Sequence, residues 1–306
     1  MRKHRVGSRL FIGLIALFLY APIVVLIVFS FNATKSRTLW AGFSFEWYIK
    51  LFQDSRIMSA CTTTLLVAVL ATLIAMVVGT ATAIGFSSMK KRPRSFFLLL
   101  NNIPLINADI ITGVSLMLLF VFMGTALAGF GRIINHMVGT STGFHVQLGF
   151  LTLLLAHITF DIPYVILSIT PKLRQLDKNL FEAAQDLGAP PWQSFWKVVL
   201  PEIRPGIFNG MLIAFTMSID DFVISYFTAG SGVSTLAMEI YSMTRKRISP
   251  EINAISTLLF LIVLLLLIII NIRQVRQDKT NARPDTMLSA IDTTEEDSAP
   301  YPTMNA

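Results

Sequence analysis

Residues 182–201 read EAAQDLGAPPWQSFWKVVLP, a polar, helix-forming stretch between two long apolar segments. Hydrophobic residues make up 54% of the 306-residue chain and charged residues only 14%. Soluble domains carry about a quarter charged residues, so the shortage of charge identifies an integral membrane protein. The quoted stretch is therefore structure that the chain builds outside the bilayer, where a partner protein can reach it.

Six apolar stretches are long enough to cross a bilayer as helices, which takes about 20 residues each. They lie near residues 9–31, 59–86, 97–124, 147–170, 206–229 and 252–273. The first stretch has no small-residue cleavage pattern at its end, so we expect an uncleaved anchor. The sequence predicts an all-α transmembrane domain over 9–275, after a short N-terminus (1–8). The tail (276–306) is too poor in apolar residues to fold.

Lysine and arginine residues predict the orientation of the chain. Of its 25 basic residues, 17 lie in residues 1–9, in the segments 87–95 and 171–205, and from residue 273 onward. Cytoplasmic segments of membrane proteins carry the excess of positive charge. Both termini and the quoted stretch are therefore expected in the cytoplasm. Because the basic residues gather at the ends of spans, they indicate topology and not a nucleic-acid surface.

The segment 171–205 is predicted to form two short helices with a turn between them. Asp177 suits the N-cap of a helix over 178–187, and Gly188 can take the left-handed conformation that ends it. A second helix is expected to begin at Pro191 and to end before the fifth span.

The end of that second helix is predicted from prolines. It should reach Leu200, because Pro201 and Pro205 lack the backbone N–H that a helix interior needs. The result is an elbow that lies beneath the membrane.

The elbow sequence resembles the EAA loop of ABC importer permeases, to which the transport ATPase binds. Val198 is a departure, since the family usually has isoleucine there. Alanines in the first helix leave room for close approach of a partner. By this resemblance the ATPase-coupling residues are Glu182, Ala183, Ala184, Asp186, Gly188, Ala189, Leu200 and Pro201.

The resemblance implies a specific machine, an ABC importer of type I in a bacterial cell membrane. Its parts are a second, similar permease subunit, two copies of a cytoplasmic ATPase and an extracytoplasmic binding protein. The chain has no G-x-x-x-x-G-K-[ST] motif, so ATP and Mg²⁺ are expected on the partner ATPase and no cofactor on this chain.

Carboxylates inside the apolar stretches are the candidates for contact with a transported substrate. An ionised Asp at mid-bilayer costs about 2.5–3.5 kcal/mol on insertion scales, so such residues point to function. No Lys or Arg lies at comparable depth, which favours a cationic substrate. The candidates are Asp109, Asp161, Asp220 and Asp221.

Each candidate has a structural alternative. The neighbours 220–221 point about 100° apart on a helix, so only one can face the pathway. His157 lies one turn before Asp161, so a His–Asp pair on the helix surface is the alternative for Asp161. Asp109 follows the run 101–104 (NNIP), where a broken helix would free backbone donors that its carboxylate could satisfy.

Further segments support a particular cargo. They are YAP (20–22), SFN (30–32), LAHITF (155–160), AA (183–184), DLGA (186–189), FTMSIDD (215–221) and SPEINA (249–254). With them, nearly all of residues 10–275 resemble the smaller permease subunit of spermidine/putrescine ABC importers. The SIDD segment agrees with the cationic substrate inferred from charge. Asp161 departs from the family, whose members tend to have an uncharged residue there.

Three other functions remain to be weighed. The nearest keeps the machine and changes the cargo to another amine or an amino-acid-derived cation. An ion-coupled transporter would use the buried acids as proton or sodium sites, but it has no ATPase to dock on the elbow. A membrane enzyme is disfavoured by the absence of H-E-x-x-H, G-x-S-x-G or paired Cys and His residues. The sequence therefore predicts no catalytic and no metal site.

Overall fold

The computed structural model describes residues 3–34, 39–138, 147–177, 179–246 and 251–272, except 266 and 270. In this part the secondary structure is helical, apart from one isolated bridge between Asn32 and Phe43. The helices are α1 (Lys3–Ser30), α2 (Glu46–Gln53), α3 (Ser55–Ser88), α4 (Lys91–Ile106), α5 (Asp109–Val138), α6 (Phe150–Gln175), α7 (Asn179–Asp186), α8 (Pro191–Ser194), α9 (Leu200–Asp220), α10 (Val223–Thr228) and α11 (Leu236–Lys246).

Six helical stretches are long and apolar enough to cross a membrane, as the sequence predicts. They are Phe11–Ser30, Ser55–Ser88, Asp109–Gly129, Phe150–Gln175, Pro191–Asp220 and Glu251–Ile269. Residues up to Phe260 form one compact unit, and the described residues from Leu261 onward belong to a second. The predicted unfolded tail (276–306) lies outside the described residues.

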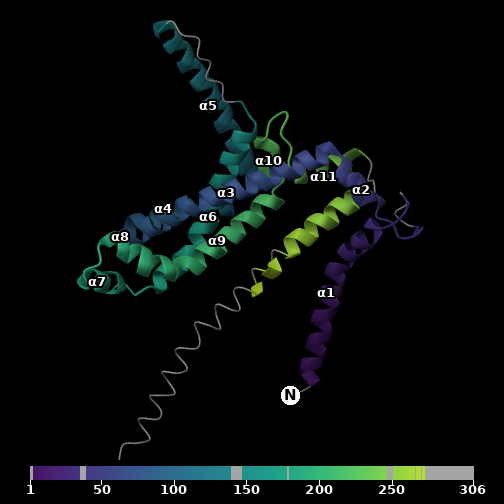
Figure 1. Cartoon of the computed structure of the whole chain (residues 1–306), viewed down its shortest axis with the longest axis horizontal. Coiled ribbons are helices and arrows are strands. Elements are labelled where there is room, and N and C mark those ends of the chain that lie inside the picture. The colour runs from purple at the N-terminus through teal and green to yellow at the C-terminus, as the bar shows by residue number, and fades with distance from the viewer. Residues whose placement is uncertain are drawn as a thin grey trace, which may run out of the picture. The chain divides into compact units, whose positions relative to one another are not determined.

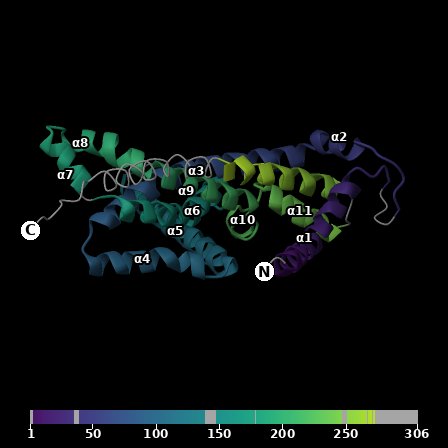
Figure 2. The same ribbon diagram turned by 90° about the horizontal axis from the view of Figure 1, so that it is seen from below.

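Helices α3, α6 and α9 run side by side and form the core of the first unit (Figures 1 and 2). Apolar side chains of α6, among them Val165, Ile166 and Ile169, are fully buried between the other two helices. Lipid tails are as apolar as these side chains, so helices in a membrane associate by close packing and not by hydrophobic burial. The core therefore depends on how near the three backbones can come.

Small residues at intervals of four bring the backbones together. On α3 they are Ala71, Ala75, Gly79 and Ala83, and on α9 they are Gly206, Gly210, Ala214 and Ser218; all eight are buried. A Cβ atom added at Gly79 would lie 2.8 Å from Val165 Cγ1, and one at Gly210 would lie 3.0 Å from Val165 Cα. Glycine is thus required where both helices meet Val165 of α6.

The third predicted span (97–124) is wrong in its boundaries. Helix α4 ends at Ile106, Asn107 takes an extended conformation, and the spanning stretch begins at Asp109. The break follows Pro104, whose ring removes one backbone donor from the last turn of α4. A hydropathy pattern cannot register this break, because apolar residues continue on both sides of it.

The fifth span is also broken. Helix α9 ends at Asp220, and the short helix α10 begins at Val223, so the predicted span over 206–229 is two helices. Asp221 lies between them with ψ of 124°, an extended conformation that ends the hydrogen bonding of α9. The chain therefore turns inside the stretch that the sequence presents as a single helix.

The first helix of the predicted elbow forms as expected. The Asp177 carboxylate accepts the Asn179 N–H at 3.0 Å, which confirms the predicted cap. Gly188 has a φ of +86°, and the Ala189 N–H donates to the Ala184 carbonyl at 3.1 Å. This is the Schellman arrangement that ends helices at a left-handed glycine.

The second elbow helix does not end before the fifth span, and this prediction is wrong. Helix α8 continues through a π-helical turn, Phe195–Val199, directly into α9. The Leu200 N–H donates to the Phe195 carbonyl, five residues back, so the hydrogen-bond register shifts just before Pro201. Pro201 then falls in the first turn of α9, where its missing N–H is tolerated. Pro205 lies inside α9 without ending it.

Replacing Gly210 with valine is expected to separate α6 from α9, because the added side chain meets the α6 backbone. Overpacking of this kind costs about 1–3 kcal/mol. Thermal melting of the detergent-solubilised protein should show the loss. Gly85→Val is the matched control, since a Cβ at Gly85 on the exposed face of α3 meets nothing within 4 Å. Equal melting temperatures for the two variants would contradict the role given to Gly210.

Candidate functional site

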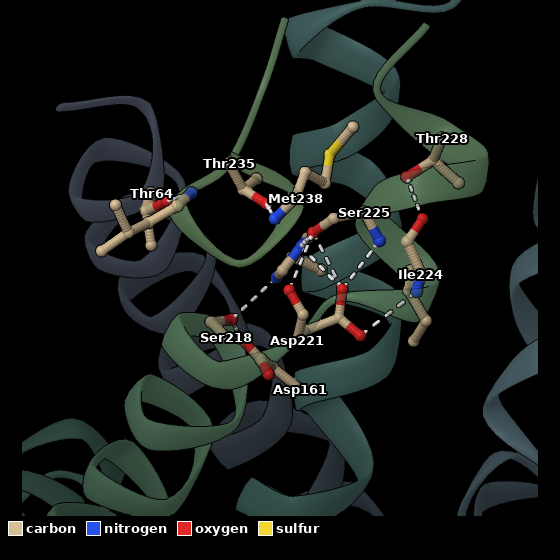
Figure 3. A network of polar contacts seen from close by, with 11 residues as sticks. Thr64, Asp161, Ser218, Asp221, Ile224, Ser225, Thr228, Thr235 and Met238 are labelled. Atoms are coloured by element: carbon tan, nitrogen blue, oxygen red, sulfur yellow. Dashed lines mark hydrogen bonds and ion pairs between the residues drawn. The ribbon is translucent and has the colours of Figure 1, made fainter. Parts of the chain in front are cut away.

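The break in span five is held by the side chain of Asp221. Its carboxylate accepts the N–H of Ile224 at 3.2 Å and the N–H of Ser225 at 2.7 Å, both in the first turn of α10 (Figure 3). The Ser225 hydroxyl donates a third bond to it at 2.8 Å. The Asp221 side chain is only 7% exposed. Asp221 therefore acts as the cap that starts α10, although the sequence presents it as a residue of a continuous helix.

A buried polar chain joins this break to α6. The two ring nitrogens of His157 contact the hydroxyls of Ser218 on α9 at 3.1 Å and of Ser225 on α10 at 3.0 Å. Ser218 also contacts Asp161 Oδ2 at 2.8 Å, and Ser225 contacts Asp221 Oδ2 at 2.8 Å. We call these five residues the buried polar chain. It links both halves of span five to the same face of α6 (Figure 3).

The local sequence explains why these side chains meet. His157 and Asp161 are one turn apart on α6, and Val165 follows one turn later on the same face. Ser218 continues the four-residue spacing of Gly210 and Ala214 on α9. The buried polar chain is therefore the polar end of the close-packed α6–α9 interface. A serine fits there because its side chain is as small as the interface requires.

Two further hydrogen bonds fix the segment that follows the break. The Thr152 hydroxyl on α6 donates to the Thr228 carbonyl at the end of α10, at 2.8 Å. The Leu236 N–H at the start of α11 donates to the Thr64 hydroxyl of α3, also at 2.8 Å. These bonds tie α10 and the loop after it to the core on both sides.

The four candidate acids separate into two pairs. Asp161 is fully buried and Asp221 nearly so, and both belong to the buried polar chain. Asp220 and Asp109 are exposed, and neither has a hydrogen bond or an ion pair with any described residue. Two expectations are corrected here. His157 reaches Asp161 only through Ser218, and Asp109 accepts none of the backbone donors at the break before α5.

The two serines of the buried polar chain are the residues that sequence reasoning missed. Ser218 lies four residues after the small residue Ala214, and Ser225 lies four residues after Asp221. The spacing of small residues on α9 was the signal that could have found Ser218. Ser225 has no such signal, because its position depends on the turn at Asp221. Among the described residues, no group of three His, Cys, Asp or Glu side chains could hold a metal ion.

The elbow presents an exposed surface at the opposite end of α9 from the break (Figure 1). Glu182, Ala183, Asp186 and Gly188 are all exposed on it. Leu187 is 89% exposed and Trp192 is 69% exposed, which is unusual for large apolar side chains. The elbow therefore exposes apolar groups beside small and charged ones on one surface.

The fold and these sites define a membrane-embedded transport subunit. The chain belongs to the family of binding-protein-dependent transport system inner membrane components, which matches residues 75–281. It is therefore a multi-pass protein of the cytoplasmic membrane and a transport component, not an enzyme.

Particular relatives make the family assignment more specific. The chain is 41% identical to the putrescine transport system permease protein PotI of Escherichia coli (strain K12), over 79% of this chain and 81% of PotI. It is 33% identical to the spermidine/putrescine transport system permease protein PotC of the same strain, over 82% of this chain and 88% of PotC.

A solved structure shares the fold. It is a bacterial ABC transporter involved in the import of the acidic polysaccharide alginate, with a TM-score of 0.65 at 18% identity. The match covers 90% of this chain and 96% of that chain. The ABC importer permease fold expected from the sequence is confirmed.

The two neighbouring acids at the break are expected to differ in their effect on stability. Asp221→Ala leaves two backbone donors and a serine hydroxyl without their acceptor, and unsatisfied buried groups cost about 1–3 kcal/mol each. Asp220→Ala removes an exposed side chain that has no partner in the described part of the chain. Thermal melting should fall for the first variant and stay unchanged for the second. A larger loss for Asp220→Ala would contradict the division of roles.

Proposed function

We propose that this chain is a permease subunit of an ATP-driven polyamine importer, in which it forms half of the translocation pathway. The observation that points to the cargo is Asp220, an exposed carboxylate at the end of a membrane-spanning stretch, with no partner among the described residues. Such a charge is costly unless a counter-ion meets it. The relatives named for putrescine and spermidine transport support a polyamine as that counter-ion.

The position of Asp220 adds to its attraction for a cation. It is the last residue of α9, whose 21 residues end with their carbonyl groups pointing toward the break. The C-terminal end of a helix carries a partial negative charge, and interrupted helices in transporters use such ends to bind cations. A primary amine can donate several hydrogen bonds to a carboxylate and to free carbonyls.

Asp109 is the second acid proposed to contact substrate. It is exposed in the first turn of α5, and α5 packs against α10, directly after the break. Close approach of these helices is possible at Gly113, where an added Cβ would lie 3.0 Å from Phe227. Two separated carboxylates suit an extended molecule with amines at both ends. Asp161, which has no exposed surface, is left out of the substrate pathway.

The elbow is proposed as the docking site of the ATPase. Its coupling residues are those of the EAA-like stretch, and the exposed Leu187 and Trp192 would be covered by the partner. Helix α8, the π turn and α9 form one stretch of 30 residues, Pro191–Asp220. A push on the elbow would therefore be transmitted along a single helix to the break that bears Asp220.

The remaining parts of the machine follow from this assignment. A second permease subunit, two ATPase copies and an extracytoplasmic binding protein would complete it, and the ATPases would bind ATP and Mg²⁺. The family description supports the binding protein. The distribution of basic residues supports both termini and the elbow in the cytoplasm. An ion-coupled transporter is not proposed, because the relatives are permease components of transport systems.

Cargo is tested with the assembled complex in vesicles. Asp220→Asn should reduce ATP-dependent uptake of radiolabelled putrescine and spermidine at least tenfold, because the amide removes the counter-charge. The complex should still assemble. Glu46→Gln, which removes an exposed charge outside the spans, should transport normally. Normal uptake by Asp220→Asn would contradict the proposed contact, and competition by another cation alone would assign a different cargo.

Coupling is tested at the turn of the elbow. Gly188→Val places a β-branched side chain at φ of +86° and should distort the turn between α7 and α8, so that ATPase capture and uptake are lost together. Gly42→Val is the matched control, since Gly42 also has a positive φ (+116°) with no atom near its Cβ position, but lies outside the elbow. ATPase capture unchanged in Gly188→Val would refute the docking site.

A further inference from the structure

We infer that Asp161 binds a proton inside the membrane-spanning core. The proton makes its carboxyl an acid and completes the hydrogen bonding of the buried polar chain (Figure 3). This inference concerns the polypeptide by itself and does not depend on the identity of the cargo.

A count of hydrogens requires this proton. The buried polar chain runs from Asp161 through Ser218, His157 and Ser225 to Asp221, with four contacts of 2.8, 3.1, 3.0 and 2.8 Å. Each contact needs one hydrogen between its two heavy atoms. The two hydroxyls supply one each, a neutral imidazole supplies one, and two carboxylates supply none. Three hydrogens cannot fill four contacts, so the buried polar chain holds one more proton.

Asp221 does not need the extra proton. Its two oxygens already receive two backbone N–H groups and one hydroxyl, which is the environment of a well-solvated carboxylate.

Asp161 has the opposite environment. Its Oδ2 has one partner, its Oδ1 has none among the described residues, and the residue is 0% exposed. A buried carboxylate with a bare oxygen is strongly disfavoured, whereas the carbonyl oxygen of a carboxylic acid carries no full charge. The proton therefore belongs on Asp161 and not on His157, since an imidazolium would leave Asp161 ionised.

With the proton on Asp161, each of the four hydrogen bonds in the buried polar chain has a defined direction. Asp161 donates to Ser218, Ser218 donates to Nδ1 of His157, Nε2–H of His157 donates to Ser225, and Ser225 donates to Asp221. The imidazole is neutral, and the single negative charge lies on Asp221.

His157 Nε2 also lies 3.6 Å from Asp221 Oδ2, which would be an ion pair only if the imidazole carried the extra proton. Among the described residues, no Lys or Arg contacts the buried polar chain and replaces the proton. Tyr164 of α6 lies within electrostatic reach of Asp161 and of Asp109 of α5, and neither Tyr164 nor Asp109 is positively charged. Arg56 lies in the first turn of α3, and Arg204 of α9 lies fourteen residues before Ser218, about 21 Å along the helix. α10 contributes only Tyr226, whose side chain is exposed.

Asp161 is thus a positioning residue for the break in span five. Through Ser218 it holds the end of α9, and through His157 and Ser225 it holds the start of α10. Because the folded protein keeps a proton that an unfolded chain releases at neutral pH, stability should fall as the pH rises. In Asp161→Asn that dependence should disappear, since the amide N–H can donate to Ser218 and does not titrate.

Infrared spectroscopy of the purified full-length protein tests the proton directly. At neutral pH the wild type should show the C=O stretch of a protonated carboxylic acid, shifted in D₂O. The band should be absent in Asp161→Asn, and Ser218→Ala should change its frequency by removing the acceptor. A wild-type spectrum without this band, or one whose band is unaffected by both variants, would overturn the inference.

Thermal melting against pH gives an independent readout. Asp161→Asn should melt at the wild-type temperature near neutral pH and show a flat profile toward alkaline pH. Asp221→Asn is the matched change at the other end of the chain and should melt lower at every pH. If Asp161→Asn is destabilised like Asp221→Asn and keeps the alkaline loss, the proton resides on His157 and the inference is wrong.

Discussion

Three helix backbones, those of α3, α6 and α9, must pack unusually close together for this fold to form. Gly79 of α3 and Gly210 of α9 both meet Val165 of α6, at distances that leave no space for a side chain. Helices in lipid gain little from covering apolar surface, so packing and buried hydrogen bonds must hold them together. The small-residue spacing supplies the packing. Where it reaches Ser218, it also supplies the first hydrogen bond of the buried polar chain.

The break in span five exists because polar groups replace the helical hydrogen bonds that it loses. Irregular backbone inside a membrane is tolerated only where the protein satisfies it. Asp221 accepts the free N–H groups of α10, and Thr152 donates to a carbonyl at the end of α10. The Asp221 contacts are local, three and four residues along the chain, whereas the bond from Thr152 to Thr228 joins residues 76 positions apart. Asp220 is left facing outward by the same turn that directs Asp221 inward.

The elbow and the break lie at opposite ends of one helical stretch. Its 30 residues, Pro191–Asp220, extend over about 45 Å at 1.5 Å per residue. The π turn at Phe195–Val199 keeps this helix continuous where two prolines would otherwise interrupt it. The docking surface proposed on the elbow and the substrate contact proposed at Asp220 are thereby connected through covalent structure and through the α6–α9 interface. This geometry suits a subunit that converts movement of a partner into movement of a pathway.

The membrane class, the six spans and the Gly188 turn can be predicted without a structure, because each depends on local composition or on one residue's backbone preference. The sequence also identified the four acids, since charge in an apolar run is visible without a structure. The continuation of α8 into α9 and the breaks at Asn107 and Asp221 were decided by tertiary contacts, which override local proline and hydropathy signals. The division between Asp220 and Asp221 was decided in the same way. Asp221 caps α10 through its near neighbours Ile224 and Ser225, but only the fold brings His157 of α6 to this turn.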